Sequence, residues 1–182
     1  MKKVLLGVTF VVLVAIAFVS ADTQVIVAPK LVTLPVLKIP DLSQLAAYSV
    51  VRVVDGDTIV VNNKGKKVKV RLIGIDTPET VHPAKPVEYY GKEASRFTRN
   101  LLKGEMIYIA SDPQGNKTDR YGRTLAYVYR VPDGLFVNAE IIRQGYGHAY
   151  TRFPFKYLEE FRQLERFARK AEKGLWAPNK EK

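Results

Sequence analysis

The 182-residue sequence contains no cysteine and only two histidines, His82 and His148. The absence of cysteine excludes disulfide bonds, thiolate–zinc sites and catalysis by a cysteine nucleophile. Two histidines also argue against a multi-histidine zinc site. The stability of the fold must therefore come from core packing.

Acidic residues are few relative to basic ones. The chain has 29 Lys and Arg against 18 Asp and Glu, which gives a net charge of +11 and a pI of about 9.8. This excess favours a polyanionic partner such as nucleic acid or an anionic surface. Charge alone is also compatible with a basic soluble protein that has no such partner.

The N-terminus has the pattern of a secretory signal peptide, predicted over residues 1–21. Lys2 and Lys3 precede an almost continuous apolar run, 4–19, and small residues at Val19 and Ala21 suit the −3 and −1 positions of a cleavage site. Cleavage would lower the net charge from +11 to +9, because it removes two lysines and no acidic residue. We expect a protein secreted to the medium, the periplasm or the cell envelope. The alternative is an uncleaved N-terminal anchor that tethers the chain to the membrane, although the run is short for a span of ~20 residues.

Residues 22–47 form a proline-containing spacer by composition. Pro29, Pro35 and Pro40 are spaced so that they block a helix and interrupt any central strand. We interpret this stretch as an extended spacer or pro-segment. The folded domain is expected at 48–178, a length that suits a single hydrophobic core.

Three short strands open the predicted domain, at 50–54, 59–62 and 67–72. Tight turns at 55–58 and 62–65 separate them, which predicts an antiparallel meander. In the third strand, Lys67, Lys69 and Arg71 fall on one face, and the alternating apolar residues fall on the other.

The rest of the domain mixes helices and strands. Helical spacing predicts helices at 88–103 and about 157–171, and a short one is predicted from Asn138, a candidate N-cap, to Gly145. Two more strands are expected at 106–110 and 123–131. This order indicates an α+β fold: a small closed five-stranded β-barrel, rather than an open sheet, with about three α-helices.

Carboxylates gather where two of these segments end. The segment 70–80 begins as a strand that holds Arg71, is broken by Thr77-Pro78, and carries Asp76 and Glu79 at its exit. Asp57 lies in the first turn. If the first and third strands are neighbours, Asp57 and Asp76 converge and could hold Ca²⁺ or Mg²⁺, which prefer oxygen ligands. The alternative is an ordinary hairpin turn without a metal.

The basic residues near these carboxylates could hold a phosphate. Arg71 and Arg123 each have a bidentate fork, and Glu79 could position or deprotonate a water molecule. Tyr121, Tyr146 and Tyr150 could stack on bases, or they could complete the core. These residues support a metal-assisted phosphodiesterase as a hypothesis; a surface arginine and an acidic turn are the alternative.

Five segments closely resemble the staphylococcal nuclease (thermonuclease) family, and they occur in the family's order. They are Val-Asp-Gly-Asp-Thr (54–58), Arg-Leu-Ile-Gly-Ile-Asp-Thr-Pro-Glu-Thr (71–80), Tyr-Gly-Lys-Glu-Ala-Ser (90–95), Asp-Arg-Tyr-Gly-Arg (119–123) and Val-Asn-Ala-Glu-Ile-Ile-Arg-Gln-Gly (137–145). The resemblance covers about 48–176. It implies an OB-type five-stranded barrel with three helices and a Ca²⁺-dependent nuclease that cleaves DNA and RNA with little sequence preference.

The resemblance also implies roles for individual residues. Asp57, Asp76 and the Thr77 backbone carbonyl would bind calcium, and Asp55 would support these ligands without binding the ion. The catalytic residues would be Glu79, which acts on the attacking water, and the phosphate-binding pair Arg71 and Arg123.

Three further residues would bind substrate, and two of them lie where the sequence departs from the family. Tyr121 would contact a terminal phosphate. Arg120 stands where a lysine is common, so its charge is kept but its geometry differs. Tyr150 would stack near the base, but it follows a stretch, 144–150, that is about one residue shorter than in the best-known member.

The main alternative function is a non-catalytic nucleic-acid-binding module on the same barrel. A pure binder needs cations and aromatic residues but not a carboxylate set. Because Arg71, Glu79, Arg123 and both aspartates are all present, the sequence favours the enzyme. No obligate protein partner is evident.

Overall fold

The computed structural model describes residues 33–81 and 86–178. By internal contacts the chain divides into two units, Met1–Leu34 and Pro35–Lys182, and every helix and strand described here belongs to the second. The predicted signal peptide or anchor, 1–21, and the first part of the predicted spacer, 22–32, lie outside the described residues. Within the described part of the chain, no helix has the length and apolar character to cross a membrane.

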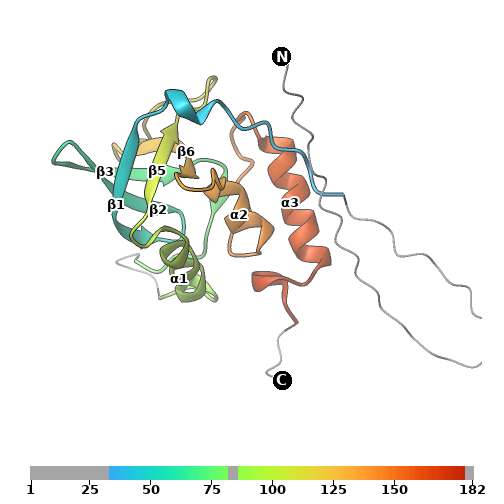
Figure 1. The fold of residues 1–182 in the computed structure, drawn as a ribbon. Coiled ribbons are helices and arrows are strands. Elements are labelled where there is room, and N and C mark those ends of the chain that lie inside the picture. Colours follow the sequence, from blue (N-terminus) through green and yellow to red (C-terminus); the bar gives the residue numbers. More distant parts are fainter. Residues whose placement is uncertain (1–32, 82–85, 179–182) are drawn as a thin grey trace, which may run out of the picture. The chain divides into compact units, whose positions relative to one another are not determined.

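Five strands form a closed barrel, as predicted (Figure 1). They are β1 (Ala47–Asp55), β2 (Thr58–Asn63), β3 (Lys66–Leu72), β5 (Met106–Ala110) and β6 (Thr124–Arg130). Their order around the barrel is β1-β2-β3-β6-β5, and β5 pairs with β1 to close it. The first three strands make the predicted antiparallel meander. The pairing of β3 with β6 is parallel.

The inward faces of these strands follow the alternation in the sequence. In β3, Val70 and Leu72 are fully buried, whereas Lys67 and Lys69, which point to the opposite face, are exposed. The largest fully buried side chains of the domain come from both the barrel and the helices: Tyr127, Tyr129, Tyr157, Phe161, Ile59, Leu72, Ile75, Leu102, Ile107, Ile141, Ile142 and Leu164. Barrel and helices therefore share one core, which supports the OB-type α+β fold.

The segment that was expected to run as one strand to Asp76 bends instead at Gly74. Its φ of +75° is a left-handed conformation that favours glycine. After the bend, β4 (Ile75–Asp76) leaves the barrel and pairs with β7 (His148–Ala149) in a separate two-stranded sheet. The bend turns the acidic exit of β3 back toward the turn between β1 and β2.

Three α-helices accompany the barrel: α1 (Gly91–Leu102), α2 (Val137–Arg143) and α3 (Leu158–Lys170). Two short 3₁₀ helices, η1 (Leu42–Gln44) and η2 (Gly174–Trp176), flank the domain. Helix α1 packs on β1, and its Thr98 hydroxyl donates a hydrogen bond of 2.6 Å to the Gly56 carbonyl. This bond fastens the β1–β2 turn to the helix.

The prediction that Asn138 is the N-cap of α2 was wrong. Phe136 occupies that position, and Asn138 lies inside the helix. Its fully buried side chain accepts a hydrogen bond from Val128 N at 2.9 Å. The same amide donates to the carbonyls of Ile73 (3.0 Å) and Ala126 (3.2 Å). Asn138 thus joins α2 to β6 and to the bend that follows β3, because buried backbone groups need partners.

Candidate active site

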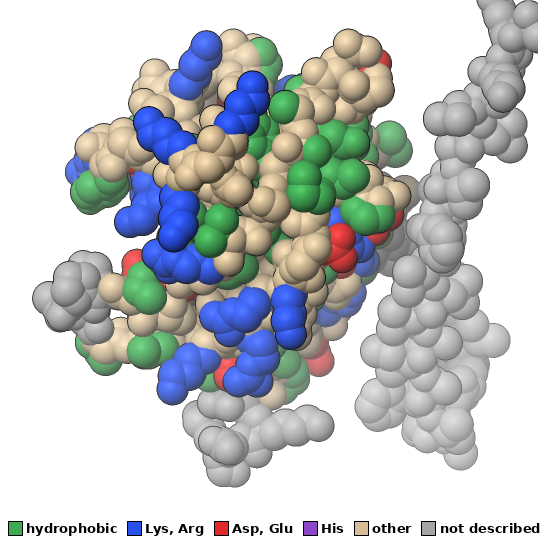
Figure 2. Space-filling view, turned by 60° about the vertical axis from the view of Figure 1, so that its left-hand side comes forward, with side chains coloured by type: hydrophobic (Ala, Val, Ile, Leu, Met, Phe, Trp, Pro, Cys, Tyr) green, Lys and Arg blue, Asp and Glu red, His purple; other side chains and the backbone are tan. Residues whose placement is uncertain are grey.

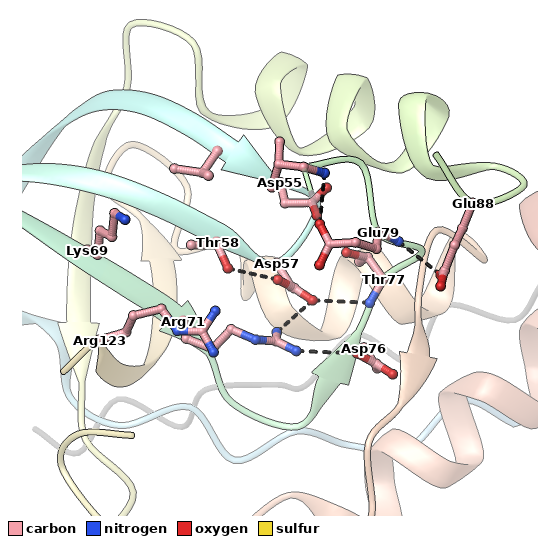
Figure 3. Close-up of a pocket in the computed structure, with 12 residues that line it drawn as sticks. Asp55, Asp57, Thr58, Lys69, Arg71, Asp76, Thr77, Glu79, Glu88 and Arg123 are labelled. Atoms are coloured by element: carbon pink, nitrogen blue, oxygen red, sulfur yellow. Dashed lines mark hydrogen bonds and ion pairs between the residues drawn. The ribbon is translucent and has the colours of Figure 1, made fainter. Parts of the chain in front are cut away.

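An open cleft of about 430 Å³ lies where the β1–β2 turn, the end of β3 and the start of β6 meet. Its twelve lining residues are Val54, Asp55, Asp57, Thr58, Lys69, Arg71, Asp76, Thr77, Glu79, Val81, Glu88 and Arg123. Figure 3 shows the basic side chains Lys69, Arg71 and Arg123 on one side and Asp55, Glu79 and Glu88 on the other, with Asp57 between them. The cleft is therefore polar and divided by charge.

Arg71 bridges the two aspartates that were predicted to converge. One terminal nitrogen lies 2.7 Å from Asp57 Oδ2 and the other lies 3.4 Å from Asp76 Oδ1. The two aspartates were expected to converge because the first and third strands would be neighbours, and this reason was wrong, since β1 and β3 are not neighbours. Instead, the β2–β3 register places Thr58 opposite Arg71, so Asp57 lies beside the arginine.

Asp57 is also held by the backbone of the segments around it. Its Oδ2 accepts a hydrogen bond from Thr77 N at 3.1 Å, and its carbonyl accepts one from Leu72 N at 2.9 Å. The Thr58 hydroxyl donates to Oδ1 at 2.9 Å. Both carboxylate oxygens thus have donors, which offsets the cost of burying the charge.

Asp76 is more open to solvent, with 58% of its side chain exposed. Partial desolvation in the cleft raises the pKa of this carboxyl, the Arg71 guanidinium opposes the shift, and the Asp57 carboxylate adds to it. Two carboxylates this close repel one another, so a shared cation stabilises both. In this structure the guanidinium of Arg71 supplies that cation.

The donors here fit a hard metal ion. Within residues 33–81 and 86–178, no three or more His, Cys, Asp or Glu side chains are arranged to hold a metal. The predicted set needs only two carboxylates and a backbone carbonyl, from Asp57, Asp76 and Thr77. Both carboxylates already reach the same guanidinium, and oxygen donors of this kind suit Ca²⁺ and Mg²⁺.

Glu79 is fixed by its own loop and by Glu88. Its Oε1 accepts hydrogen bonds from Thr80 N at 3.1 Å and Val81 N at 2.8 Å. Its backbone N–H donates to Glu88 Oε2 at 3.0 Å, and its carbonyl accepts from Glu88 N, also at 3.0 Å. These four bonds set both the backbone and the carboxylate of Glu79 at the edge of the cleft.

Asp55 ties the β1–β2 turn to the Glu79 loop. Its oxygens accept hydrogen bonds from Gly56 N (2.9 Å), Thr80 N (3.2 Å) and the Thr80 hydroxyl (2.8 Å). Burial raises the pKa of Asp55 to about 6, and a side-chain hydrogen bond with Glu79 adds to the shift. The residue thus touches the loops that carry the candidate catalytic and metal-binding groups, in keeping with the supporting role implied by the resemblance.

Arg123 enters the cleft from a turn that Asp119 organises. Asp119 Oδ2 lies 2.6 Å from Arg123 Nε, and Oδ1 accepts hydrogen bonds from Tyr121 N (2.9 Å) and Arg123 N (3.0 Å). Burial raises the pKa of Asp119, but the hydrogen bonds from Arg123 outweigh it and leave the pKa below its ordinary value. The carboxylate therefore stays ionised and holds the arginine in one orientation.

The three predicted substrate-binding residues lie outside the lining of the cleft. Arg120 donates a hydrogen bond of 2.6 Å to the exposed Tyr121 hydroxyl, and the guanidinium carbons of Arg120 and Arg123 lie 4.7 and 5.4 Å from the Tyr121 ring centroid. Tyr150 contacts Phe153 instead, with ring centroids 6.2 Å apart. Only Arg120 and Tyr121 are thus linked to a residue of the cleft.

Tyr146, considered as a base-stacking residue, is already stacked within the domain. Its ring lies 4.0 Å from that of Phe97, with an interplanar angle of 10°, and 5.5 Å from that of Tyr90. The alternative interpretation of this aromatic residue, as part of the packing, is the one that the structure supports.

Sequence reasoning assigned no role to Asp119, Glu88 or Lys69. The spacing of four residues between Asp119 and Arg123 is a local signal that could have found the first. Lys69 shares a strand face with Arg71 and was detectable by alternation. Glu88 has no such signal, because it lies nine residues from Glu79 and no periodic pattern links the two positions.

Comparison with known proteins agrees with this geometry. Residues 69–178 match the model of a family described as staphylococcal nuclease homologue. A thermonuclease of Staphylococcus hyicus is 44% identical over 131 residues, which cover 71% of this chain and 75% of the relative. This chain belongs to the staphylococcal nuclease family. The resemblance to this family that five sequence segments indicated is thereby confirmed.

Other members of the staphylococcal nuclease family are similar over nearly the same region. A thermonuclease of Staphylococcus intermedius is 41% identical over 131 residues, 71% of this chain and 76% of the relative. Endonuclease YncB of Bacillus subtilis (strain 168) is 38% identical over 128 residues, 69% of this chain and 59% of the relative. Three of the five family motifs, 54–58, 71–80 and 119–123, supply nine of the twelve residues that line the cleft.

Proposed function

We propose that this protein is a calcium-dependent nuclease that hydrolyses phosphodiester bonds of DNA and RNA with little sequence preference. The observation that carries the proposal is the charge division of the cleft, where Arg71 and Arg123 lie on one side of Asp57 and Glu79 lies on the other. Hydrolysis of a phosphodiester needs positive charge on its nonbridging oxygens and a base or orienting group for water. The similarity to two thermonucleases and an endonuclease supports the same class of reaction.

In the proposed mechanism the two arginines bind the scissile phosphate. A guanidinium has five N–H donors, more than Arg71 uses on Asp57, Asp76 and the Leu72 carbonyl. Arg123 gives its Nε donor to Asp119 and keeps its two terminal nitrogens for an anion. Both groups stabilise the charge that develops on the phosphate oxygens as water attacks.

Glu79 orients the attacking water and accepts its proton. Its Oε1 is held by two backbone N–H groups, and a carboxylate has about four lone-pair sites, so it can also accept a hydrogen bond from water. Asp57, Asp76 and the Thr77 carbonyl would hold calcium. When bound, the ion supplies positive charge next to the phosphate.

We also propose that the protein acts outside the cytoplasm. This proposal rests on the leader-like sequence at 1–21. N-terminal sequencing of protein recovered from the medium or the cell envelope tests it. A start near Asp22 is expected for a cleaved signal peptide, whereas an intact N-terminus in the membrane fraction would indicate an anchor.

The nuclease is tested by incubating the purified chain with single-stranded DNA, duplex DNA and RNA, in Ca²⁺, in Mg²⁺ and in chelator. Cleavage should require calcium, and Glu79→Gln should lower the rate by ~10²–10⁴, the usual contribution of a general base. Glu93→Gln is the matched control, because Glu93 is exposed on α1 and does not line the cleft.

Two results would contradict the proposal. Wild-type cleavage by Glu79→Gln would remove the role assigned to this carboxylate. Salt-sensitive binding without cleavage in any metal would make the protein a nucleic-acid-binding module instead.

A further inference from the structure

One face of β3 carries a row of three basic side chains, Lys67, Lys69 and Arg71, here called the β3 cation row. The alternate residues point into the barrel, so the three cations share its outer face. Lys67 and Lys69 are exposed and Arg71 is half-buried. Figure 2, which brings the β1–β3 side of the barrel forward, shows Lys and Arg side chains gathered on this side.

The β3 cation row runs directly into the cleft. Lys69 and Arg71 line the cleft together with Arg123, and Figure 3 shows these three on the same side of it. Lys67 lies two residues farther along the strand, toward the β2–β3 hairpin. The positive wall of the cleft therefore continues beyond the site assigned to the scissile phosphate.

The lysines of this row have no acidic neighbours in the sheet. The β2 residues opposite the row are Thr58, Val60 and Asn62, which are all uncharged. In the described part of the chain, no carboxylate lies within ion-pair distance of Lys67 or Lys69. On α3, by contrast, Arg162 and Arg169 are paired with Glu159 and Glu165.

We propose that the β3 cation row binds the phosphates of the nucleic-acid strand that flank the bond held at Arg71. Side chains on one face of a β-strand repeat every two residues, which is roughly 6.6 Å. Successive phosphates of a nucleic-acid strand follow one another at a similar through-space separation. Arg71, Lys69 and Lys67 can therefore meet successive phosphates in turn.

This inference rests on the proposed function for its substrate class, but it concerns binding rather than hydrolysis. It predicts that a well-bound substrate extends at least two nucleotides beyond the cleaved bond, along β3. Oligonucleotides too short to extend beyond Arg71 would not contact the two lysines, so the lysines would not increase their affinity.

The test compares two double variants of the 182-residue chain: Lys67→Gln/Lys69→Gln and the control Lys103→Gln/Lys170→Gln. Both remove two exposed lysines and the same net charge, but the control positions lie after α1 and at the end of α3, away from the cleft. Binding of a fluorescent oligothymidylate of about ten nucleotides is measured by anisotropy across a salt series. Chelator is present to prevent hydrolysis, and thermal melts verify that each variant is folded.

For single strands, each phosphate contact contributes about 0.7 to the slope of log K against log salt. Lys67→Gln/Lys69→Gln should therefore lower the magnitude of the slope by about 1.4 and weaken binding several-fold at low salt. The control should change neither, and a dinucleotide should bind both variants alike.

Equal slopes for the two double variants would overturn the inference. The readout is also separate from the nuclease proposal. A lower slope in a protein that never cleaves would support phosphate binding by the β3 cation row and contradict the nuclease proposal. Cleavage with an unchanged slope would support the nuclease proposal and contradict the role of the row.

Discussion

The buried carboxylate of Asp112 is expected to hold β5, β6 and the entry to α3 together. The residue is 5% exposed and lies two residues after the end of β5. Its Oδ2 accepts hydrogen bonds from the Tyr127 hydroxyl on β6 and from Lys156 N before α3, at 2.8 Å for the latter. Its Oδ1 accepts one from Gln114 N, also at 2.8 Å.

Asp112→Asn keeps the size of the side chain but places an amide NH₂ where Oδ2 or Oδ1 accepts. If the amide oxygen of the new asparagine faces Gln114 N, its NH₂ group replaces Oδ2. The two hydrogen bonds to Oδ2 are then lost, and Lys156 N faces the NH₂ group, which is also a donor. Hydrogen bonds to charged groups are worth ~1.5–3 kcal/mol each, and relief from burying a charge offsets part of the loss. We expect a loss of about 2–4 kcal/mol in the free energy of unfolding at neutral pH, with Tm lower by roughly 2–4 °C per kcal/mol.

The pH dependence provides a second, independent measure. Burial raises the pKa of Asp112, but the hydrogen bonds from Lys156 N and the Tyr127 hydroxyl outweigh it, so the pKa lies below its ordinary value. A lowered folded-state pKa stabilises the protein above the unfolded value of about 3.9, and that stabilisation disappears as the pH falls through the folded-state pKa. The difference between wild type and Asp112→Asn should therefore shrink on acidification.

Chemical denaturation at about pH 7 and about pH 3 measures both effects. Asp133→Asn is the control, because Asp133 is 48% exposed and its ion pair with Arg130 lies at the surface, where such pairs are worth ~0–1 kcal/mol. A loss below ~1 kcal/mol for Asp112→Asn at neutral pH, or a difference that stays the same in acid, would refute the reasoning.

Two further predictions concern side chains that act through buried or shared hydrogen bonds. Glu88→Ala should lower kcat ~10–100-fold with little change in KM or Tm, because the backbone N–H of Glu79 loses its acceptor and small displacements of a catalytic group are costly. Glu88→Gln keeps an acceptor and should retain the wild-type rate. A wild-type kcat in Glu88→Ala would argue against this role. Asn138→Leu should destabilise the domain by ~3 kcal/mol or more, since it removes the partners of Val128 N and of the Ile73 carbonyl and one of the two hydrogen bonds to the Ala126 carbonyl. A melt within 2 °C of wild type would contradict this, on the scale of roughly 2–4 °C per kcal/mol.

The sequence alone determined which residues face the core and which chemistry the chain can support. The alternation at 67–72 placed three cations on one face of β3, as the structure confirms. The order of five motifs indicated the barrel and the family. Periodicity is local, so it is legible in a single sequence wherever an element has one buried face.

The tertiary structure decided which elements meet. The parallel pairing of β3 with β6 and the bend at Gly74 were not legible in the sequence, and both depend on closure of the barrel. The register of β2 with β3 brings Asp57 to Arg71, rather than pairing of the first and third strands as expected.

The same limit explains the missed roles of Asn138 and Glu88. Asn138 is of a residue type that favours helix caps, but backbone groups of β6 and of the Gly74 bend bind its side chain inside α2. Glu88 lies nine residues after Glu79, and the two are joined by hydrogen bonds. Long-range hydrogen bonds satisfy groups that are buried when distant segments pack, and no pattern within a single segment records that event.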